Sequence, residues 1–595
     1  MIVDRLCQSG LDTFFGVPGG PVIPIFDAIL TNPRARLVES RHETHGTFAA
    51  MGFHRASGAA PVIVVTAGPG ATNVVTGVVA AHLERIPMVI LSGDVAWAAT
   101  GQKLLQDVGP AGIGIESMLS HVCRCVVRVS HAESAAAQVQ LAIQAATDPA
   151  NPGPALVVVS IDRSGSRGVG TEVVVAPSRR THTAPSKALL TRIERQLRAA
   201  ARPLLVLGAG CRNGAEAVTE LVDALGVPFM TTPQAKGVVS EEHPLSLRNG
   251  GMGASFWARA YTKALPDLAL VLGTDLDDVS TAGTPPIGPN GQIIHVDVDP
   301  SVFARNHRTP MGVVCDVGTF ASALSRVVRA AGPIANGAAL AAATKAGPAF
   351  DAPAFATDEA VPIAPHRVVA DLARAAPPTA TFVTDIGEHM LFALHYFTAR
   401  SKDAFVIHLG LGSMGSGIGS AIGLALADRS RPVVCICGDG GMQMAGMELL
   451  IAIHLRLPVV FAVFNDGRYN MVYHGYRMTF GRSAPFDAPI VDFVKWAESL
   501  GARGVRIDGP NEIDARLFSN WKDAGPVVLD VRQDAAVRIK GDGRLEAIRQ
   551  MSLIHVNDAA NDPAPAAGNG RSSGVVLAVR PEPQAAGLDG DSWER

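Results

Sequence analysis

The sequence predicts an α/β protein made of three consecutive open parallel-sheet domains. Short apolar runs rich in β-branched residues end repeatedly at glycine turns, as the strands of buried parallel sheets do. These runs recur in three separate blocks, and stretches long enough for a helix lie between them. The chain has 595 residues, enough for several hydrophobic cores at about 150 residues per domain.

The first two blocks span residues 1–165 and 190–330. In the first block, "PVIVVTAGPGATN" and "PMVILSGD" are apolar runs that stop at glycine. In the second block, "RPLLVLGAG", "DLALVLGTD" and "QIIHVDVDP" have the same form. We interpret each block as a domain with its own parallel sheet.

The third block spans residues 362–535 and contains "TFVTDIGEH", "RPVVCICGDG" and "PVVFAVFND". The stretch before it, residues 330–356, is rich in Ala, Gly and Pro, which predicts a linker. After the third block, residues 555–595 have the small and polar composition of a disordered tail.

Charge and hydropathy exclude several classes of protein. The formal net charge is −3 and the sequence pI is about 6.6, which argues against binding to nucleic acid or to a membrane surface through bulk charge. The first residues do not have the pattern of a signal peptide, and no apolar run approaches the roughly 18 residues of a membrane span. We expect a cytoplasmic protein that acts on small molecules, with no nucleic-acid or membrane partner.

Two aspartates in the third block are spaced as ligands of a metal ion. The sequence predicts a strand at Val433–Cys437, a helix at Met444–Leu455 and a strand at Val459–Phe464. In a right-handed crossover both strands end at the same sheet edge, about 4.8 Å apart if they are neighbours, so Asp439 and Asp466 should converge. Two neighbouring carboxylates favour a bound cation, and oxygen ligands suit Mg²⁺.

Glycines surround the first of these aspartates. Gly438, Gly440 and Gly441 leave the start of the helix free of side chains. Free N–H groups and the positive end of the helix dipole can hold a phosphate there. The segment therefore predicts a diphosphate site bridged by a metal ion.

Five segments in order resemble the thiamine-diphosphate enzymes of the acetolactate synthase and pyruvate oxidase type. They are "FFGVPGG", "RHETHGTFAAMGFHRASG", "TAGPGATN", "GLGSMGSGIGSAIG" and the stretch at 438–466. The resemblance covers nearly all of the chain up to about residue 535. It implies an N-terminal pyrimidine-binding domain, a central domain and a C-terminal domain that binds the diphosphate and Mg²⁺. It also implies that the cofactor lies between two subunits, as in a homodimer or homotetramer.

The resemblance assigns roles to individual residues. Glu43 matches the glutamate that hydrogen-bonds the pyrimidine ring and favours the tautomer that removes the thiazolium C2 proton. Met414 matches the bulky residue that props the cofactor into its bent shape. Gly387 and His389 match a segment that helps to hold the diphosphate, in which Glu388 stands where the family often has glutamine. The other implied cofactor-binding residues are Gly412, Gly438, Gly440, Gly441 and Met471.

The implied metal ligands include one departure from the family. The family usually has Asn-Asn at positions 465 and 466, whereas here the second residue is Asp466, which keeps an oxygen ligand and adds negative charge. With Asp439, the third implied protein ligand is the backbone carbonyl of Arg468.

Two residues are candidates for contact with the substrate. The segment "GQKLLQDVG" resembles the place where acetolactate synthases carry a glutamine that faces the reacting carbon, which implies a catalytic role for Gln106. His45, two residues after Glu43, could relay a proton or could be structural. After the metal ligand, Tyr473, His474 and Tyr476 depart from the family's usual tryptophan pattern, which indicates a non-standard substrate.

The central domain is ambiguous with respect to FAD. The segment "VLGTDLDDVSTAG" resembles the flavin-binding segment of acetolactate synthases, but both arginines are missing. Thr274 and Val279 are the nearest occupants of those positions. Without these cations, FAD binding is a weaker expectation than binding of thiamine diphosphate.

These features predict a thiamine-diphosphate-dependent carboligase. It would decarboxylate a pyruvate-like 2-oxo acid and add the acyl carbanion to a second carbonyl. A 2-oxo acid decarboxylase or acyl transferase of the same superfamily is an alternative, although the loop "SGDVAWAATGQ" lacks the His pair typical of plain decarboxylases. A non-catalytic relative would not need Glu43, Asp439 and Met414 together. A nicotinamide dehydrogenase is disfavoured, because "LGAGCRNG" lacks the spacing G-x-G-x-x-G.

Overall fold

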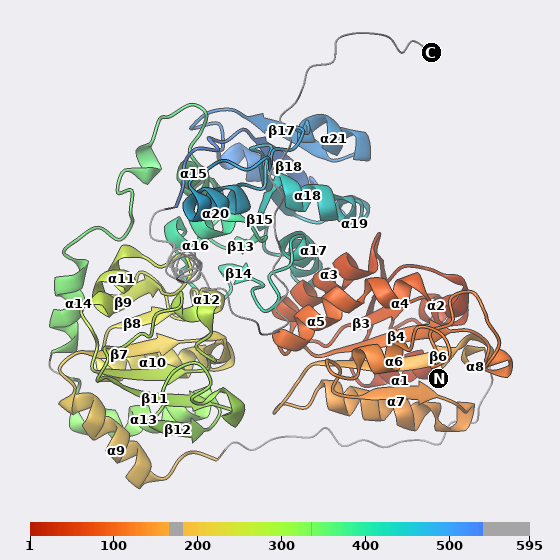
Figure 1. The fold of residues 1–595 in the computed structure, drawn as a ribbon, viewed down its shortest axis with the longest axis horizontal. Helices are drawn as coiled ribbons and strands as arrows, with labels where there is room; N and C mark the ends of the chain where they lie inside the picture. Colours follow the sequence, from red (N-terminus) through yellow and green to blue (C-terminus); the bar gives the residue numbers. More distant parts are fainter. Residues whose placement is uncertain (166–182, 335, 540–595) are drawn as a thin grey trace, which may run out of the picture. The chain divides into compact units, whose positions relative to one another are not determined.

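The computed structural model describes residues 1–165, 183–334 and 336–539. They form three six-stranded sheets, and every pairing between the strands of these sheets is parallel (Figure 1). The helices between the strands cover the sheets, so the predicted fold class is confirmed. No helix in these ranges combines the length and the apolar character needed to cross a membrane. The predicted disordered tail at 555–595 lies outside the described residues.

The first sheet has the strand order β2-β1-β3-β4-β6-β5. Its central strands are apolar and buried on both faces, as the continuous hydrophobic runs predict. The strands are β1 Thr13–Gly16, β2 Arg36–Glu39, β3 Val62–Val65, β4 Met88–Asp94, β5 Val126–Val129 and β6 Pro154–Ser160. The helices are α1 Ile2–Gln8, α2 Ile23–Thr31, α3 Glu43–Ser57, α4 Pro69–Asn73, α5 Val75–Leu83, α6 Ile115–Leu119, α7 Ala132–Ala146 and α8 Ile161–Ser164.

The central sheet has the strand order β12-β11-β10-β7-β8-β9. Its strands are β7 Pro203–Leu207, β8 Phe229–Thr231, β9 Ser246–Asn249, β10 Leu268–Leu272, β11 Gln292–Asp297 and β12 Met311–Val314. The helices of this part are α9 Lys187–Ala199, α10 Ala215–Leu225, α11 Phe256–Lys263, α12 Asp278–Thr281, α13 Val317–Ala331 and α14 Gly337–Lys345.

The third sheet has the order β14-β13-β15-β16-β18-β17, which repeats the connectivity of the first sheet strand for strand. Its strands are β13 Thr381–Thr384, β14 Phe405–Ile407, β15 Val433–Gly438, β16 Val459–Phe464, β17 Arg503–Ile507 and β18 Val527–Val531. Its helices are α15 Pro365–Ala375, α16 Glu388–Tyr396, α17 Ser416–Ala427, α18 Asp439–Ala445, α19 Leu449–His454, α20 Asn470–Phe480 and α21 Phe493–Leu500. The first and third sheets are therefore two versions of one topology.

Helices α3 and α17 occupy equivalent positions in these two sheets, and they pack directly on each other. A Cβ atom added at Gly423 would lie 1.8 Å from the carbonyl oxygen of Ala49. One added at Gly52 would lie 2.1 Å from the carbonyl oxygen of Ser420. The glycines thus let the two helix backbones touch, and this contact brings the start of α3 close to the loop that precedes α17.

The predicted helix at Met444–Leu455 was wrong in its limits. The helical segment begins at Asp439, and a 3₁₀ turn at Gly446–Glu448 divides it into α18 and α19. At this turn a Cβ on Gly446 would lie 2.9 Å from the ring of Trp496, and the buried carboxylate of Glu448 bonds a distant backbone segment. These tertiary contacts determine where the helix is interrupted between α18 and α19. The periodicity of apolar residues carries no information about such contacts.

The predicted linker at 330–356 was also wrong in part. It contains helix α14, which buries Gly337 and Ala341. The Nζ atom of Lys345 at the end of α14 donates to the carbonyl oxygen of Pro244 at 2.9 Å. Alanine favours a helix more strongly than the flanking Gly and Pro residues oppose it, and packing on the central sheet supplies the rest.

Candidate active site

Glu43 is the first residue of α3, in the turn that follows β2. Its side chain is buried, and its Oε2 atom accepts a hydrogen bond from Nδ2 of Asn73 at 3.1 Å. Gly70, in the same short helix as Asn73, adds no side chain beside the other carboxylate oxygen: a Cβ there would lie 3.1 Å from Oε1. The segments "RHETHG" and "TAGPGATN" therefore meet at the Glu43 carboxylate.

Gln106 lies in the loop after β4, next to the segment that contacts the Glu43 carboxylate. A Cβ on Gly68 would lie 2.7 Å from Cβ of Gln106, so the loop packs on the turn before α4. Gln106 has a φ of 64°, in the left-handed region that is uncommon for residues other than glycine. The backbone N–H of Val108 donates to Oδ1 of Asp94 at 3.2 Å, which ties the loop to the end of β4. The structure thus brings Gln106 into contact with the segment whose Asn73 forms a hydrogen bond to Glu43.

His45 lies at the contact between the first and third parts of the chain. Its Nδ1 atom is 4.0 Å from Oε1 of Glu448, and a Cβ on Gly415 would lie 3.5 Å from its Nε2 atom. Burial, and then the neighbouring His42, lower the pKa of His45 to about 4. His45 is therefore neutral near pH 7 and lies close to the residue that follows Met414.

Met414 stands over the glycine turn that follows β15. Its Cε atom would lie 3.1 Å from a Cβ on Gly440, and the ring of Tyr469 lies over the same position. Gly412 and Gly415 have φ values of 71° and 86°, so the loop that carries Met414 needs glycines in the left-handed region on both sides. The structure thus brings Met414 and Gly440 together.

Asp439 and Asp466 follow the adjacent strands β15 and β16, as predicted. The backbone N–H of Gly467 donates to Oδ2 of Asp439 at 2.9 Å, which joins the two turns. Nε2 of Gln533 donates to Oδ2 of Asp466, also at 2.9 Å. Burial raises the pKa of Asp439, whereas burial together with the charge of Asp439 raises the pKa of Asp466 to about 7. A cation placed between the two carboxylates would stabilise their ionised forms.

Arg468 and Met471 follow Asp466 in the same turn and the start of α20. The guanidinium of Arg468 lies 4.2 Å from the centre of the Tyr473 ring, and Met471 packs against the apolar core of the third sheet. Among the described residues, no group of three or more His, Cys, Asp or Glu side chains is arranged to hold a metal ion. The predicted ligand set has a different composition, with two carboxylates and a backbone carbonyl.

Gly387 and His389 lie at the start of α16, beside the end of β15. Cβ atoms built on Gly387 and Gly438 would lie 2.8 and 3.1 Å from Nδ1 of His389, so the ring fills the space that glycine leaves at both positions. Nε2 of His389 is buried and has no hydrogen-bond partner in the described structure. Oδ1 of Asn470 and Oε1 of Gln533 are buried without a partner in the same way. The unsatisfied atoms of His389 and Asn470 therefore lie in segments predicted to bind the cofactor and the metal, and Gln533 contacts the predicted ligand Asp466.

Glu388, which stands where the family often has glutamine, is held by Asn470 at the start of α20. Nδ2 of Asn470 donates to its Oε2 atom at 2.6 Å, and Nε2 of His474 lies 3.7 Å from the same oxygen. Burial, and then the charge of Asp466, raise the pKa of Glu388 to about 8. The side chain is therefore largely protonated near pH 7, which reduces its repulsion of an anionic ligand.

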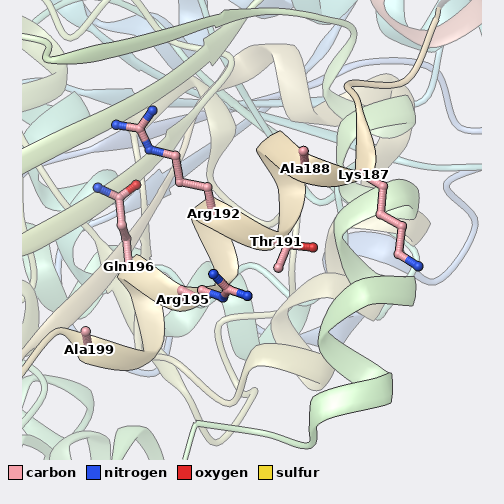
Figure 2. A pocket seen from close by; sticks show the side chains of 7 residues that line it. All are labelled: Lys187, Ala188, Thr191, Arg192, Arg195, Gln196 and Ala199. Carbon is pink, nitrogen blue, oxygen red and sulfur yellow. The ribbon is translucent and has the colours of Figure 1, made fainter.

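Among the described residues, a separate hollow on the surface is lined by the helix α9 alone (Figure 2). Its lining residues recur along a single helix, and none of them is a predicted site residue. Binding sites for small molecules collect polar groups from several elements, so we do not assign a function to this hollow.

Sequence reasoning missed two buried carboxylates in this region. Oε1 of Glu448 accepts from the backbone N–H groups of Arg41 and His42, at 3.1 and 2.8 Å, and so holds the turn before Glu43. Asp385 accepts from the backbone N–H groups of Gly415 and Gly417. The only local signal for Asp385 was its position at the end of a predicted strand, and Glu448 lay unmarked inside a predicted helix.

Comparison with known families gives three matches in the order of the three sheets. The N-terminal TPP binding domain of thiamine pyrophosphate enzymes matches residues 1–112, the central domain matches residues 190–324 and the C-terminal TPP binding domain matches residues 385–531. Together the matches span more than half of the chain.

Individual relatives are similar over almost the whole chain. A putative acetolactate synthase large subunit from Mycobacterium tuberculosis is 29% identical, with 90% of this chain and 97% of the relative aligned. The mitochondrial acetolactate synthase catalytic subunit from Saccharomyces cerevisiae is 29% identical over 90% of this chain and 80% of its own length. The acetolactate synthase isozyme 1 large subunit from Escherichia coli is 28% identical, with 90% of this chain and 94% of the relative aligned. With three ordered domain matches and acetolactate synthase relatives similar over 90% of its length, the chain belongs to the thiamine pyrophosphate enzymes of the acetolactate synthase type.

Proposed function

We propose that this thiamine-diphosphate-dependent carboligase decarboxylates a pyruvate-like 2-oxo acid and joins the remaining acyl group to a second carbonyl compound. The observation that carries the proposal is the presence of two half-sites in the chain. The Glu43–Asn73 pair belongs to the first half-site, and the Asp439–Asp466 pair belongs to the second. The acetolactate synthase relatives favour a pyruvate-like donor.

Glu43 is proposed to orient the cofactor's pyrimidine ring. When bound, thiamine diphosphate supplies a thiazolium carbon that accepts the electron pair left when a 2-oxo acid loses CO₂. Glu43 is buried and ends in a carboxylate that can share a proton with a ring nitrogen. The Asn73 hydrogen bond holds that carboxylate, and Glu448 holds the turn before it.

Asp439, Asp466 and the carbonyl of Arg468 are proposed to bind Mg²⁺. The support is chemical, because the buried Asp439 raises the cost of ionising its half-buried neighbour Asp466 and oxygen-only ligands suit this ion. The proposed diphosphate contacts are Gly387, His389, Gly438, Gly440 and Gly441, where glycine leaves room and the buried Nε2 of His389 lacks a partner.

The substrate is proposed to lie between Gln106 and the start of α20. Gln106 sits beside the turn next to Glu43, and Met414 lies against Gly440 in the turn that follows β15. Neutral His45 is proposed to accept a proton. Tyr473, His474 and Tyr476, which differ from the usual tryptophan pattern, are proposed to select the substrate.

We also propose that the central domain binds no FAD. In the segment with the missing arginines, Oγ1 of Thr274 accepts from the backbone N–H of Leu276 at 3.2 Å, and Asp277 caps α12 through Ser280. These polar groups are satisfied within the chain, and the nearby aspartates would repel a pyrophosphate. The visible absorption spectrum of the purified holoenzyme should lack a flavin band, and a bound flavin would refute this part.

The protein is further proposed to be a homodimer or homotetramer in the cytoplasm with active sites shared between subunits. A mixture of E43Q and D439A subunits tests the sharing. If each site takes Glu43 from one subunit and Asp439 from the other, a mixed dimer has one intact site and regains activity. If each chain builds its own site, mixing the two inactive variants restores nothing. Co-purification of the two variants, each carrying a different affinity tag, shows that subunits have exchanged.

The proposed reaction is tested by incubating the enzyme with thiamine diphosphate, Mg²⁺ and single 2-oxo acids. We expect CO₂ release that depends on both ligands. An acyl group recovered as a free aldehyde would favour the decarboxylase alternative, and transfer to phosphate or a thiol would favour the acyl transferase. Absence of CO₂ from every 2-oxo acid would refute all three.

A further inference from the structure

We propose that Asp385 is a positioning residue that holds the loop carrying Met414 against the glycine turn of the diphosphate site. The inference deepens the proposed function and rests on it, because Met414 can shape a cofactor only if thiamine diphosphate is bound. Asp385 is not among the residues that the sequence marks for the reaction, and it would act on the cofactor through the segments that it holds.

The carboxylate of Asp385 bonds the backbone of the loop directly after Met414. Asp385 follows β13, and its side chain is fully buried. The N–H of Gly415 donates to Oδ2 at 3.0 Å, and the N–H of Gly417 donates to Oδ1 at 2.9 Å. One carboxylate therefore holds the turn into α17 at two points, and the first of these points is the residue next to Met414.

Asp385 also touches the glycine turn after β15. A Cβ on Gly441 would lie 2.2 Å from Oδ2 of Asp385, so only glycine fits beside this oxygen. On the other side, a Cβ on Gly417 would lie 2.5 Å from Cα of Asp385. The side chain is therefore enclosed between the Met414 loop and the turn that contains Asp439, and it sets the spacing of these two segments.

The side chain of Met414 depends on that spacing. Its Cε atom reaches the position over Gly440, one residue before the glycine that faces Asp385. Burial raises the pKa of Asp385 to about 6, while the Gly415 and Gly417 N–H groups act in the opposite direction. Above that pH the ionised carboxylate accepts both bonds, and bonds to a charged acceptor are stronger than neutral ones.

The test is the variant Asp385→Asn in the full-length protein loaded with thiamine diphosphate and Mg²⁺. An amide keeps the size of the side chain, but its NH₂ group would face one of the two N–H donors. We expect hydrogen–deuterium exchange at the cofactor C2, read by NMR after acid quench, to slow by about 10- to 100-fold. The Kd for thiamine diphosphate should rise, whereas the Kd for inorganic pyrophosphate with Mg²⁺ should stay within about twofold.

The matched control is Asp371→Asn. Asp371 is also fully buried and accepts from Arg367 and Arg374, but it bonds no segment of the predicted site. This variant should lower the melting temperature and leave C2 exchange unchanged. If both variants slow exchange equally, Asp385 acts only through general stability and the inference is wrong.

A double-mutant cycle tests whether Asp385 acts through Met414. If it does, adding Asp385→Asn to Met414→Ala should slow exchange little beyond Met414→Ala alone, whereas independent effects would multiply. If Asp385→Asn does not fold, Asp385→Glu takes its place, because it keeps the charge and both acceptor oxygens. The added methylene would displace the loop, so a smaller slowing is expected.

Failure of the proposed function and failure of the proposed role of Asp385 give different results. If the wild type binds no thiamine diphosphate, the proposed function fails. If the wild type binds the cofactor and exchanges C2 rapidly, but Asp385→Asn and Asp385→Glu do the same, only the role of Asp385 is refuted.

Discussion

Replacing Glu43 with glutamine should lower turnover by roughly 10²- to 10⁴-fold, the usual contribution of a general acid–base group. Glutamine fills the same buried space, but it cannot share a proton with the pyrimidine ring, so C2 exchange should slow with turnover. Binding of the cofactor should persist, because the proposed diphosphate and Mg²⁺ ligands follow strands of the third sheet.

The matched control is Glu39→Gln. Glu39 lies at the end of the same strand β2, but it is exposed and forms a surface ion pair with Arg41. Such pairs contribute little to stability, so turnover and exchange should match those of the wild type. Wild-type exchange in Glu43→Gln would show that Glu43 does not activate the cofactor.

Replacing Asp439 with alanine should abolish the stabilisation that thiamine diphosphate and Mg²⁺ give together. A ligand that binds only the folded state stabilises by about 2.7 kcal/mol at a hundredfold excess over its Kd. Asp439 also accepts from the backbone N–H of Gly467, so its loss would separate the two metal-binding turns. The measurement is the melting temperature with neither ligand, with each alone and with both.

Asp523→Ala serves as the control, because Asp523 is exposed and lies in the segment between β17 and β18. It should keep the full ligand-dependent shift. A metal-free wild type that melts at the same temperature with and without both ligands would contradict the proposed cofactor site, and so would an undiminished shift in Asp439→Ala.

Features that depend on neighbouring residues were predictable from the sequence. Glycine and aspartate next to an apolar run mark the end of a strand, and two adjacent parallel strands must end at the same edge, so the pairing of Asp439 with Asp466 followed from the pattern. The Glu43 segment was identified by resemblance, because a single acidic residue has no local signature of catalysis. The order of the strands in each sheet was not predicted.

Features that depend on distant contacts were not predictable. Glu448 bonds the backbone of Arg41, 407 residues away in the sequence, and Asp385 bonds Gly415, 30 residues away. Nothing adjacent to either carboxylate indicates these partners. The break between α18 and α19 and the packing of α14 have the same cause, since tertiary contacts overrule local propensity.

The measurement that tests the account most directly is the stoichiometry of the reaction with pyruvate or the best 2-oxo acid found. With thiamine diphosphate and Mg²⁺ present, a carboligase should release one CO₂ for each new carbon–carbon bond, and the wild type should form the coupled product while Glu43→Gln forms almost none. Equal amounts of CO₂ and free aldehyde, or product formation that is unaffected by Glu43→Gln, would contradict the account.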